Sequence, residues 1–191
     1  MMRIITGSKK GKKLLTLEGL QTRPTSERIK GAIFSSIQFD IEYRRVLDLF
    51  AGSGQMGLEA LSRGAAHATF IDSSREAMEI VKKNAASTDF FDRSHFLVQD
   101  YRNYIRKAGG KEAFDLVFID PPYAMSCCVE AAYLLKKEGL LLDGAILCLE
   151  SGEENIDISD ERLSGFELIK STNYGKKSNV NILLYHGEEK E

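Results

Sequence analysis

The sequence predicts an α/β fold built on a mostly parallel sheet, and three observations point to it. From residue 46 onward, short apolar runs alternate with amphipathic helical patterns, which is typical of βα units. A glycine-rich turn over residues 52–57 joins the first apolar run to the first helical pattern. The last two apolar runs have no helical pattern between them, so they are expected to pair as an antiparallel hairpin at the sheet edge.

Two elements come before the sheet. Residues 3–6 and 13–17 are β-type runs around a turn rich in glycine and lysine, and they predict a small β-hairpin. A helix is expected over residues 25–38, because three isoleucines share one face there: Ile29, Ile33 and Ile37. We therefore expect a basic arm over residues 1–22 and a single domain over residues 23–191.

The sheet itself is expected to have seven strands. Five apolar runs predict the parallel strands: 46–50, 68–72, 95–98, 115–119 and 145–149. Two further runs, 166–171 and 180–185, predict the closing hairpin. Helices are expected over residues 58–63 and 129–137, and another begins after Ser73 or Ser74, either of which suits a helix N-cap.

Length and composition favour an ordinary cytoplasmic domain. The chain has 191 residues, of which 43% are hydrophobic, and no apolar run approaches the roughly 20 residues of a membrane-spanning helix. The first residues lack the apolar stretch of a secretory signal. The three cysteines have no C-x-x-C spacing, so the sequence indicates neither a disulfide framework nor a metal site.

Charge is distributed unevenly along the chain. Residues 1–30 contain eight basic and two acidic side chains, whereas the remainder is acidic. A basic arm on an acidic body suggests a polyanionic partner, although a cluster such as residues 9–13 is as often a solvated turn. The candidate RNA-contacting residues are Arg3, Lys9, Lys10, Lys12, Lys13, Arg23, Thr25 and Arg28.

The glycine-rich turn predicts a nucleotide-type cofactor site. Gly52, Gly54 and Gly57 satisfy the G-x-G-x-x-G pattern, and Asp72 follows at the end of the next strand, where a carboxylate can bind ribose hydroxyls. This pattern alone also fits NAD. Asp48, just before the turn, disfavours a pyrophosphate and suits the cationic amine and sulfonium of S-adenosylmethionine. The full candidate set is Asp48, Phe50, Ala51, Gly52, Ser53, Gly54, Gly57, Asp72, Ser73, Asp100 and Tyr101.

The fourth parallel strand runs directly into the candidate catalytic residues Asp120, Pro121, Pro122 and Tyr123. Two prolines stiffen this strand end and supply no backbone donors. The segment resembles the D-P-P-Y signature of methyltransferases that act on exocyclic amino groups of bases. A carboxylate and a carbonyl that accept hydrogen bonds from such an amine favour a localised lone pair, and a tyrosine can stack on an extruded base.

Nearly the whole chain resembles the RsmD family of bacterial 16S ribosomal RNA guanine-N2 methyltransferases, which have a Rossmann-like class I fold. The resemblance is carried by segments 3–7, 23–28, 48–65 and 120–123, of which Arg-Pro-Thr-x-x-Arg at 23–28 is the most specific. It implies S-adenosylmethionine as donor and one guanine of the small subunit, of the position-966 type, as acceptor. It also implies an assembled or partly assembled subunit as substrate; we expect a monomer without a metal.

Three other functions share some of these sequence features. An adenine-N6 DNA or RNA methyltransferase shares the D-P-P-Y chemistry, but only about 70 residues separate the glycine turn from Asp120, too few for a DNA-recognition domain there. An NAD-linked oxidoreductase lacks an evident proton-donating pair. A non-enzymatic RNA-binding module requires neither Asp120 nor the acids of the cofactor site.

Overall fold

The computed structural model describes residues 2–17, 24–122, 125–152, 156–175 and 178–187, with the backbone alone for residues 24–26. The chain divides into two compact units, Met1–Tyr101 and Arg102–Glu191.

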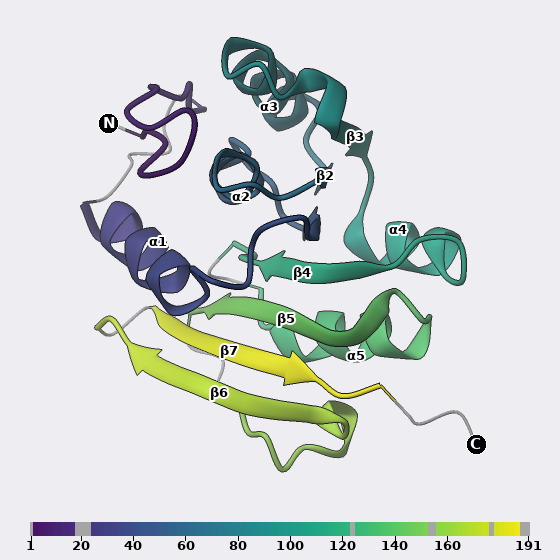
Figure 1. The fold of residues 1–191 in the computed structure, drawn as a ribbon. Coiled ribbons are helices and arrows are strands. Elements are labelled where there is room, and N and C mark those ends of the chain that lie inside the picture. Colours follow the sequence, from purple (N-terminus) through teal and green to yellow (C-terminus); the bar gives the residue numbers. More distant parts are fainter. Residues whose placement is uncertain (1, 18–23, 123–124, 153–155, 176–177, 188–191) are drawn as a thin grey trace. The chain divides into compact units, whose positions relative to one another are not determined.

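The first unit is built on three parallel strands (Figure 1). The central strand β2 (His67–Asp72) pairs with β1 (Arg45–Asp48) on one side and with β3 (Ser94–Val98) on the other. Helix α2 (Gln55–Ser62) packs against β1 and β2, and α3 (Arg75–Ser87) packs against β2 and β3. A short 3-10 helix, η1 (Phe91–Arg93), leads into β3.

Helix α1 (Pro24–Ser36) begins with a proline, whose fixed φ suits the first helical position. The predicted core residues Ile29 and Ile33 of this helix are buried, and so is Ile37 directly after its end, which confirms the helical face. The side chain of Ser74 caps α3 by accepting the Ala77 N–H at 3.1 Å, so the second of the two candidate caps is the one used.

The N-terminal arm, residues 2–17, pairs with itself over a shorter stretch than expected. Its antiparallel pairing consists of one bridge, Arg3 with Lys13, flanked by hydrogen bonds such as Ile4 N–H to Lys12 C=O at 2.9 Å. The next two amides, of Ile5 and Thr6, donate to the carboxylate of Glu59 instead. Because those donors are taken by a side chain, the ladder cannot extend into two regular strands.

The second unit contains the remaining strands. Strand β4 (Phe114–Ile119) pairs in parallel with β5 (Leu141–Ser151). Strand β7 (Asn179–Tyr185) lies antiparallel between β5 and β6 (Phe166–Asn173), which confirms the predicted hairpin. Helix α5 (Cys128–Lys137) packs against β5 and the short helix η2 (Glu161–Leu163) (Figure 1). Helix α4 (Tyr101–Ala108) begins at the boundary of the units.

Within the described ranges the seven strands follow the order β3-β2-β1-β4-β5-β7-β6. This is the expected mostly parallel sheet with an antiparallel hairpin at one edge. Among the same residues, no helix combines the length and the apolar content that crossing a bilayer requires.

Candidate functional site

The glycine turn between β1 and α2 uses its three glycines in different ways. Gly52 and Gly54 have φ of 55° and 78°, a left-handed conformation that side chains disfavour. A Cβ on Gly57 would lie 2.4 Å from the Phe70 ring, so this glycine allows α2 to approach β2 closely. A Cβ on Gly52 would meet no atom within 4 Å. Gly52 is therefore the motif glycine whose backbone a ligand can approach.

Asp48 at the end of β1 acts as a cap for α2. The N-cap residue of this helix is Gly54, which has no side chain, and the Oδ2 atom of Asp48 accepts the Gly57 N–H at 3.0 Å. The carboxyl is fully buried, and burial raises its pKa to about 7. The hydrogen bond from Gly57 opposes this rise, and the charge of Asp72 adds to it. A bound cation would favour the ionised form.

Asp72 at the end of β2 holds two turns together. Its Oδ2 atom accepts the Gly52 N–H and its Oδ1 atom accepts the Ser74 N–H, each at 2.8 Å. Each carboxylate oxygen retains capacity for a further hydrogen bond. The side chain therefore sets the conformation of the glycine turn and can still bind a ligand hydroxyl. Ser73 between the two turns is exposed.

The third acid of the predicted site follows β3. Gln99 donates its N–H to the Asp72 C=O at 2.9 Å, which fixes the chain just before Asp100 to the end of β2. Asp100 is partly exposed, and the next residue, Tyr101, packs its ring 5.0 Å from that of Phe50. The Ala51 N–H donates to the Ile71 C=O at 2.9 Å. The first unit thus brings the predicted donor-site residues to the carboxyl ends of its three strands.

In the second unit, Asp120 follows the last residue of β4. It is partly exposed, whereas Pro121 is buried and Pro122 is exposed. The Pro122 C=O accepts the Met125 N–H at 2.8 Å. Tyr123 lies outside the described residues.

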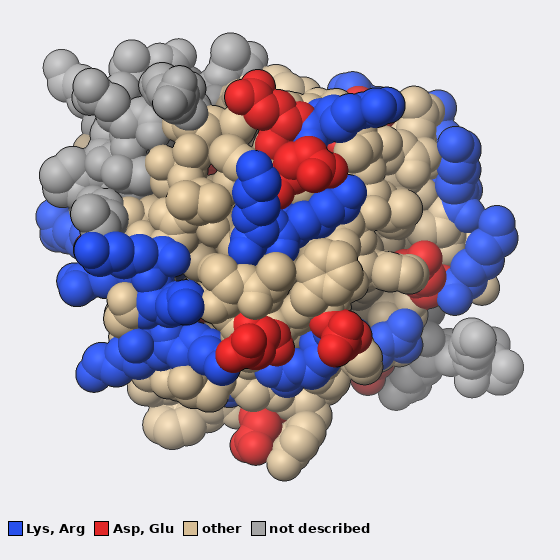
Figure 2. All heavy atoms as spheres, turned by 90° about the horizontal axis from the view of Figure 1, so that it is seen from above, with Lys and Arg blue, Asp and Glu red and all other residues tan. Residues whose placement is uncertain are grey.

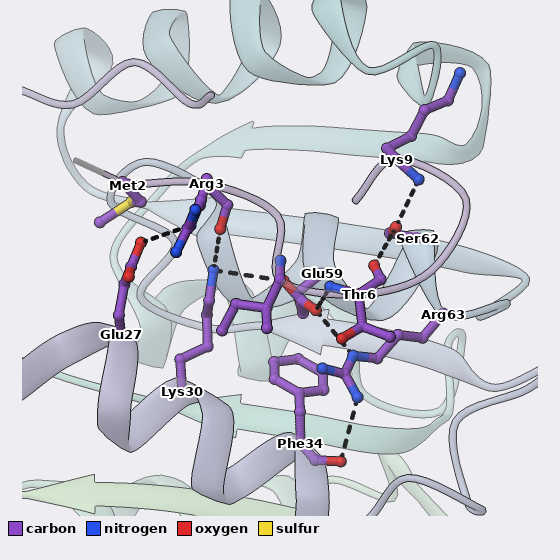
Figure 3. Close-up of polar contacts among 12 residues, drawn as sticks. Met2, Arg3, Thr6, Lys9, Glu27, Lys30, Phe34, Glu59, Ser62 and Arg63 are labelled. Carbon is purple, nitrogen blue, oxygen red and sulfur yellow. Dashed lines mark hydrogen bonds and ion pairs between the residues drawn. The ribbon is translucent and has the colours of Figure 1, made fainter. Parts of the chain in front are cut away.

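A buried ionic cluster fastens the arm to α2 (Figure 3). Glu59 has no exposed surface and accepts the N–H groups of Ile5 and Thr6 at 2.7 and 2.9 Å. It also pairs with Lys30 at 3.5 Å and with Arg63 at 2.9 Å. Burial lowers the pKa of Lys30, and the charge of Glu59 opposes that effect. The Lys30 ammonium also donates to the Arg3 C=O at 2.7 Å, so arm, α1 and α2 share one network.

The turn of the arm rests on the end of α2. Ser62 C=O accepts the Ser8 N–H at 2.8 Å, and a Cβ on Gly7 would lie 1.9 Å from the same oxygen. The Ser62 hydroxyl donates to Thr6 C=O and accepts the Lys9 N–H. This contact requires glycine at position 7 and fixes the lysine-bearing turn.

The basic residues of the arm differ in their surroundings. Lys9 pairs with Asp89 at 2.6 Å, and Arg3 pairs with Glu27 at 3.4 Å. The other candidate lysines of the arm are exposed: Lys10, Lys12 and Lys13. Figure 2 shows basic side chains at both the left and the right edges of the face drawn, and basic and acidic ones side by side over its centre. Arg28 in α1 is exposed, whereas Arg23 and the Thr25 side chain lie outside the described residues.

The residues that bind the arm to the rest of the unit are not among the predicted site residues. Glu59, Ser62 and Asn84 are buried polar residues in helices whose other buried side chains are apolar. A polar side chain inside an apolar stripe was the signal that could have found them, because such a group needs a buried partner. Among the described residues, no group of three or more His, Cys, Asp or Glu side chains is placed to hold a metal ion.

Known proteins resemble this chain over nearly its full length. A profile of the family described as conserved hypothetical protein 95 matches residues 2–183. The putative rRNA methyltransferase YlbH of Bacillus subtilis is 36% identical over 148 residues, which are 74% of this chain and 80% of that protein. Ribosomal RNA small subunit methyltransferase D of Escherichia coli K12 is 34% identical over 154 residues, 81% and 76% of the two chains.

Solved structures agree in fold. The putative methyltransferase yhhF from Escherichia coli aligns with a TM-score of 0.86 and 30% identity, covering 98% of this chain and 99% of that one. The putative methylase HI0767 from Haemophilus influenzae aligns with a TM-score of 0.81 and 27% identity, covering 97% and 98%. The strand order and these neighbours define a Rossmann-like class I methyltransferase fold. Within that class, the chain belongs to the RsmD family, the family of conserved hypothetical protein 95.

Proposed function

We propose that this protein transfers a methyl group from S-adenosylmethionine to the exocyclic N2 amine of a guanine in 16S rRNA. The substrate is the small ribosomal subunit or an assembly intermediate of it, and the protein acts as a cytoplasmic monomer. The observation that carries the proposal is membership of the RsmD family together with Asp-Pro-Pro directly after β4. Two relatives are named rRNA methyltransferases.

The donor-site residues fit a cationic, ribose-bearing ligand. The backbone at Gly52 faces open space, and Asp72 holds that backbone in place. A nearby cation would favour the ionised form of the buried Asp48 carboxyl. Bound at this turn, S-adenosylmethionine supplies an electrophilic methyl group on a sulfonium, and the sulfur keeps the electron pair of the broken bond. In this assignment Asp48 faces the cationic part, Asp72 binds the ribose hydroxyls, and Asp100 binds the adenine amine.

Asp120 is assigned to the guanine amine. An aromatic amine is a poor nucleophile because its lone pair is delocalised into the ring. The Asp120 carboxylate and the Pro121 carbonyl accept hydrogen bonds from its two N–H groups, which favours a pyramidal nitrogen with an available lone pair. As the new N–C bond forms, the amine becomes acidic, and the carboxylate is placed to accept the released proton. Tyr123 is assigned to stack on the base.

The lysines of the arm are assigned to RNA phosphates. Contacts of this kind supply affinity and salt dependence but little sequence choice. The arm is anchored to α2 at Glu59 and Ser62, so its lysines have a fixed position relative to the glycine turn within the first unit.

The proposal is tested by methyl transfer to 30S particles isolated from a strain that lacks this activity. Labelled donor is supplied, the rRNA is digested, and the labelled nucleoside is identified. The expected product is N2-methylguanosine. N6-methyladenosine would select the adenine-N6 alternative, and absence of transfer together with tight NADH binding would overturn the proposal.

A further inference from the structure

Asn84 in α3 joins the N-terminal arm to the glycine turn. Its side chain is 1% exposed. The Oδ1 atom accepts the Leu15 N–H at 2.8 Å, and the Nδ2 group donates to Leu15 C=O at 3.0 Å and to Ser53 C=O at 2.9 Å. One buried amide therefore binds both backbone groups of an arm residue and the carbonyl at the centre of Gly52-Ser53-Gly54.

The same corner holds a second contact between arm and turn. The Ser53 hydroxyl donates to the Met2 sulfur at 3.0 Å. Met2 and Leu14 close the base of the arm, since Leu14 N–H donates to Met2 C=O at 2.9 Å. Met2 thus contacts Ser53 directly, and Leu15 is joined to the same residue through Asn84.

These contacts link two equilibria, detachment of the arm and ordering of the glycine turn. Detaching the arm breaks the bonds of Asn84 to Leu15, and the amide that remains is free to leave Ser53. A looser glycine turn binds a ligand less tightly, because ordering it then costs conformational entropy. Linkage is reciprocal, so a ligand that orders the turn must oppose detachment of the arm to the same extent.

We infer that Asn84 is a positioning residue that couples attachment of the RNA-contacting arm to occupation of the methyl-donor site. The inference rests on the proposed function, because it takes the glycine turn as the place where the donor binds. Donor binding then fixes the arm in the position in which its lysines meet the RNA.

The test is amide hydrogen exchange of the full-length protein, with and without S-adenosylhomocysteine. The reporters are arm amides whose acceptors lie in α2, so that detachment of the arm exposes them: Ile5, Thr6 and Ser8. In the wild-type protein, saturating ligand is expected to slow their exchange about fivefold or more. In Asn84→Ala, the same ligand is expected to leave their rates nearly unchanged.

Thr88→Ala is the matched control. Thr88 is also buried in the same helical segment and donates only to the Asn84 and Ala85 carbonyls, so its removal touches neither Leu15 nor Ser53. This variant is expected to keep the slowing seen in the wild type. Two results would overturn the inference and leave the proposed function intact. One is equal slowing in Asn84→Ala, and the other is ligand binding to the wild type without slower exchange of the arm amides. Failure of the wild type to bind the ligand would contradict the proposed function as well. The wild-type comparison needs no variant, so it can overturn the inference even where Asn84→Ala fails to fold.

Discussion

The glycine turn after β1 and the Asp-Pro-Pro segment after β4 carry the two halves of the proposed reaction, but they are held in place differently. In the turn, Asp48 and Asp72 accept the backbone amides of Gly57, Gly52 and Ser74. After β4, two consecutive prolines fix the backbone without any N–H donor. The acids of the turn therefore have a structural role beside the one proposed for them in donor binding, whereas the role proposed for Asp120 is in methyl transfer.

This difference has a consequence for substitutions. Changes to the acids or glycines of the turn are expected to alter stability and donor affinity at the same time. Changes to Asp120 are expected to alter methyl transfer far more than donor affinity.

The largest effect is expected for Asp120→Ala. Loss of the hydrogen bonds and of the proton acceptor is expected to lower the rate of methyl transfer by about 10²–10⁴-fold. Affinity for S-adenosylhomocysteine and the melting temperature are expected to stay close to the wild type. Single-turnover transfer to 30S particles, calorimetry and thermal melting measure the three quantities. Asp115→Asn, within β4, serves as the control, and transfer at the wild-type rate by Asp120→Ala would remove Asp120 from the mechanism.

Asp48→Asn is expected to change stability and donor affinity in opposite directions. The amide is isosteric and can still accept the Gly57 N–H, but it cannot attract a cation. We expect donor affinity at pH 8 to fall about 10- to 100-fold. We expect the free energy of unfolding at pH 8 to rise by about 1–4 kcal/mol, since the buried charge is gone. Asp143→Asn, an exposed carboxyl that accepts one backbone N–H, should change neither.

The pH dependence of the wild type follows from the same group. Burial raises the pKa of Asp48 from 3.8 to about 7, so the folded protein holds this proton more tightly than the unfolded chain does. The stability that Asp48 contributes is fully present below pH 3.8 and is lost as the pH rises to about 7. Donor affinity should change in the opposite sense and increase through pH 7, where Asp48 ionises. Denaturation and calorimetry between pH 5 and 8 check both trends, and Asp48→Asn should flatten them.

Substitutions of Gly57 and Gly52 are expected to differ in their effects on stability and on donor affinity. Gly57→Ala places a methyl group against the Phe70 ring and should cost about 1–3 kcal/mol of stability. Gly52→Ala meets no neighbour and should cost about 1 kcal/mol through its positive φ, but its methyl group enters the space assigned to the donor. The stability loss is therefore larger for Gly57 and the loss of donor affinity larger for Gly52. The reverse order in denaturation and calorimetry would contradict these roles.

The smallest effects are expected in the arm. Lys9 is already paired with Asp89, whereas Lys10 is exposed. Lys10→Ala should reduce the dependence of RNA affinity on salt by about one unit of slope, and Lys9→Ala by less. Asp89→Asn releases Lys9 and should raise RNA affinity slightly. Binding of an rRNA fragment over a range of salt concentrations measures all three, and equal slopes for the two lysine variants would show that the ion pair does not matter.

Much of the fold was predictable because it follows local patterns. The alternation of apolar runs and helical patterns gave the strands β1 to β5, and the missing helix between residues 171 and 180 gave the hairpin of β6 and β7. Helix α4 was missed, although Tyr101, Tyr104, Ile105 and Ala108 bury one face at helical spacing. Strand β5 is longer than predicted because Leu141 pairs with Phe114 across an irregular register.

The contacts that fix the arm were not predictable in this way. Glu59 meets Ile5 and Thr6 across more than fifty residues of sequence, and Asn84 meets Leu15 across 69. A sequence pattern records which side of a helix is buried, but it does not record which distant backbone group a buried polar side chain will meet. Asp48 and Asp72 were predicted as candidate site residues because a motif fixes their spacing from the glycines.

The division of roles between the two segments is tested most directly by two measurements on each of three proteins. The dissociation constant for S-adenosylhomocysteine and the single-turnover rate of methyl transfer at saturating donor are compared for the wild type, Asp48→Asn and Asp120→Ala. The account predicts that Asp48→Asn weakens binding and keeps most of the rate, while Asp120→Ala keeps binding and loses the rate. Loss of ligand binding in Asp120→Ala, or an unaltered rate in the same variant, would contradict it.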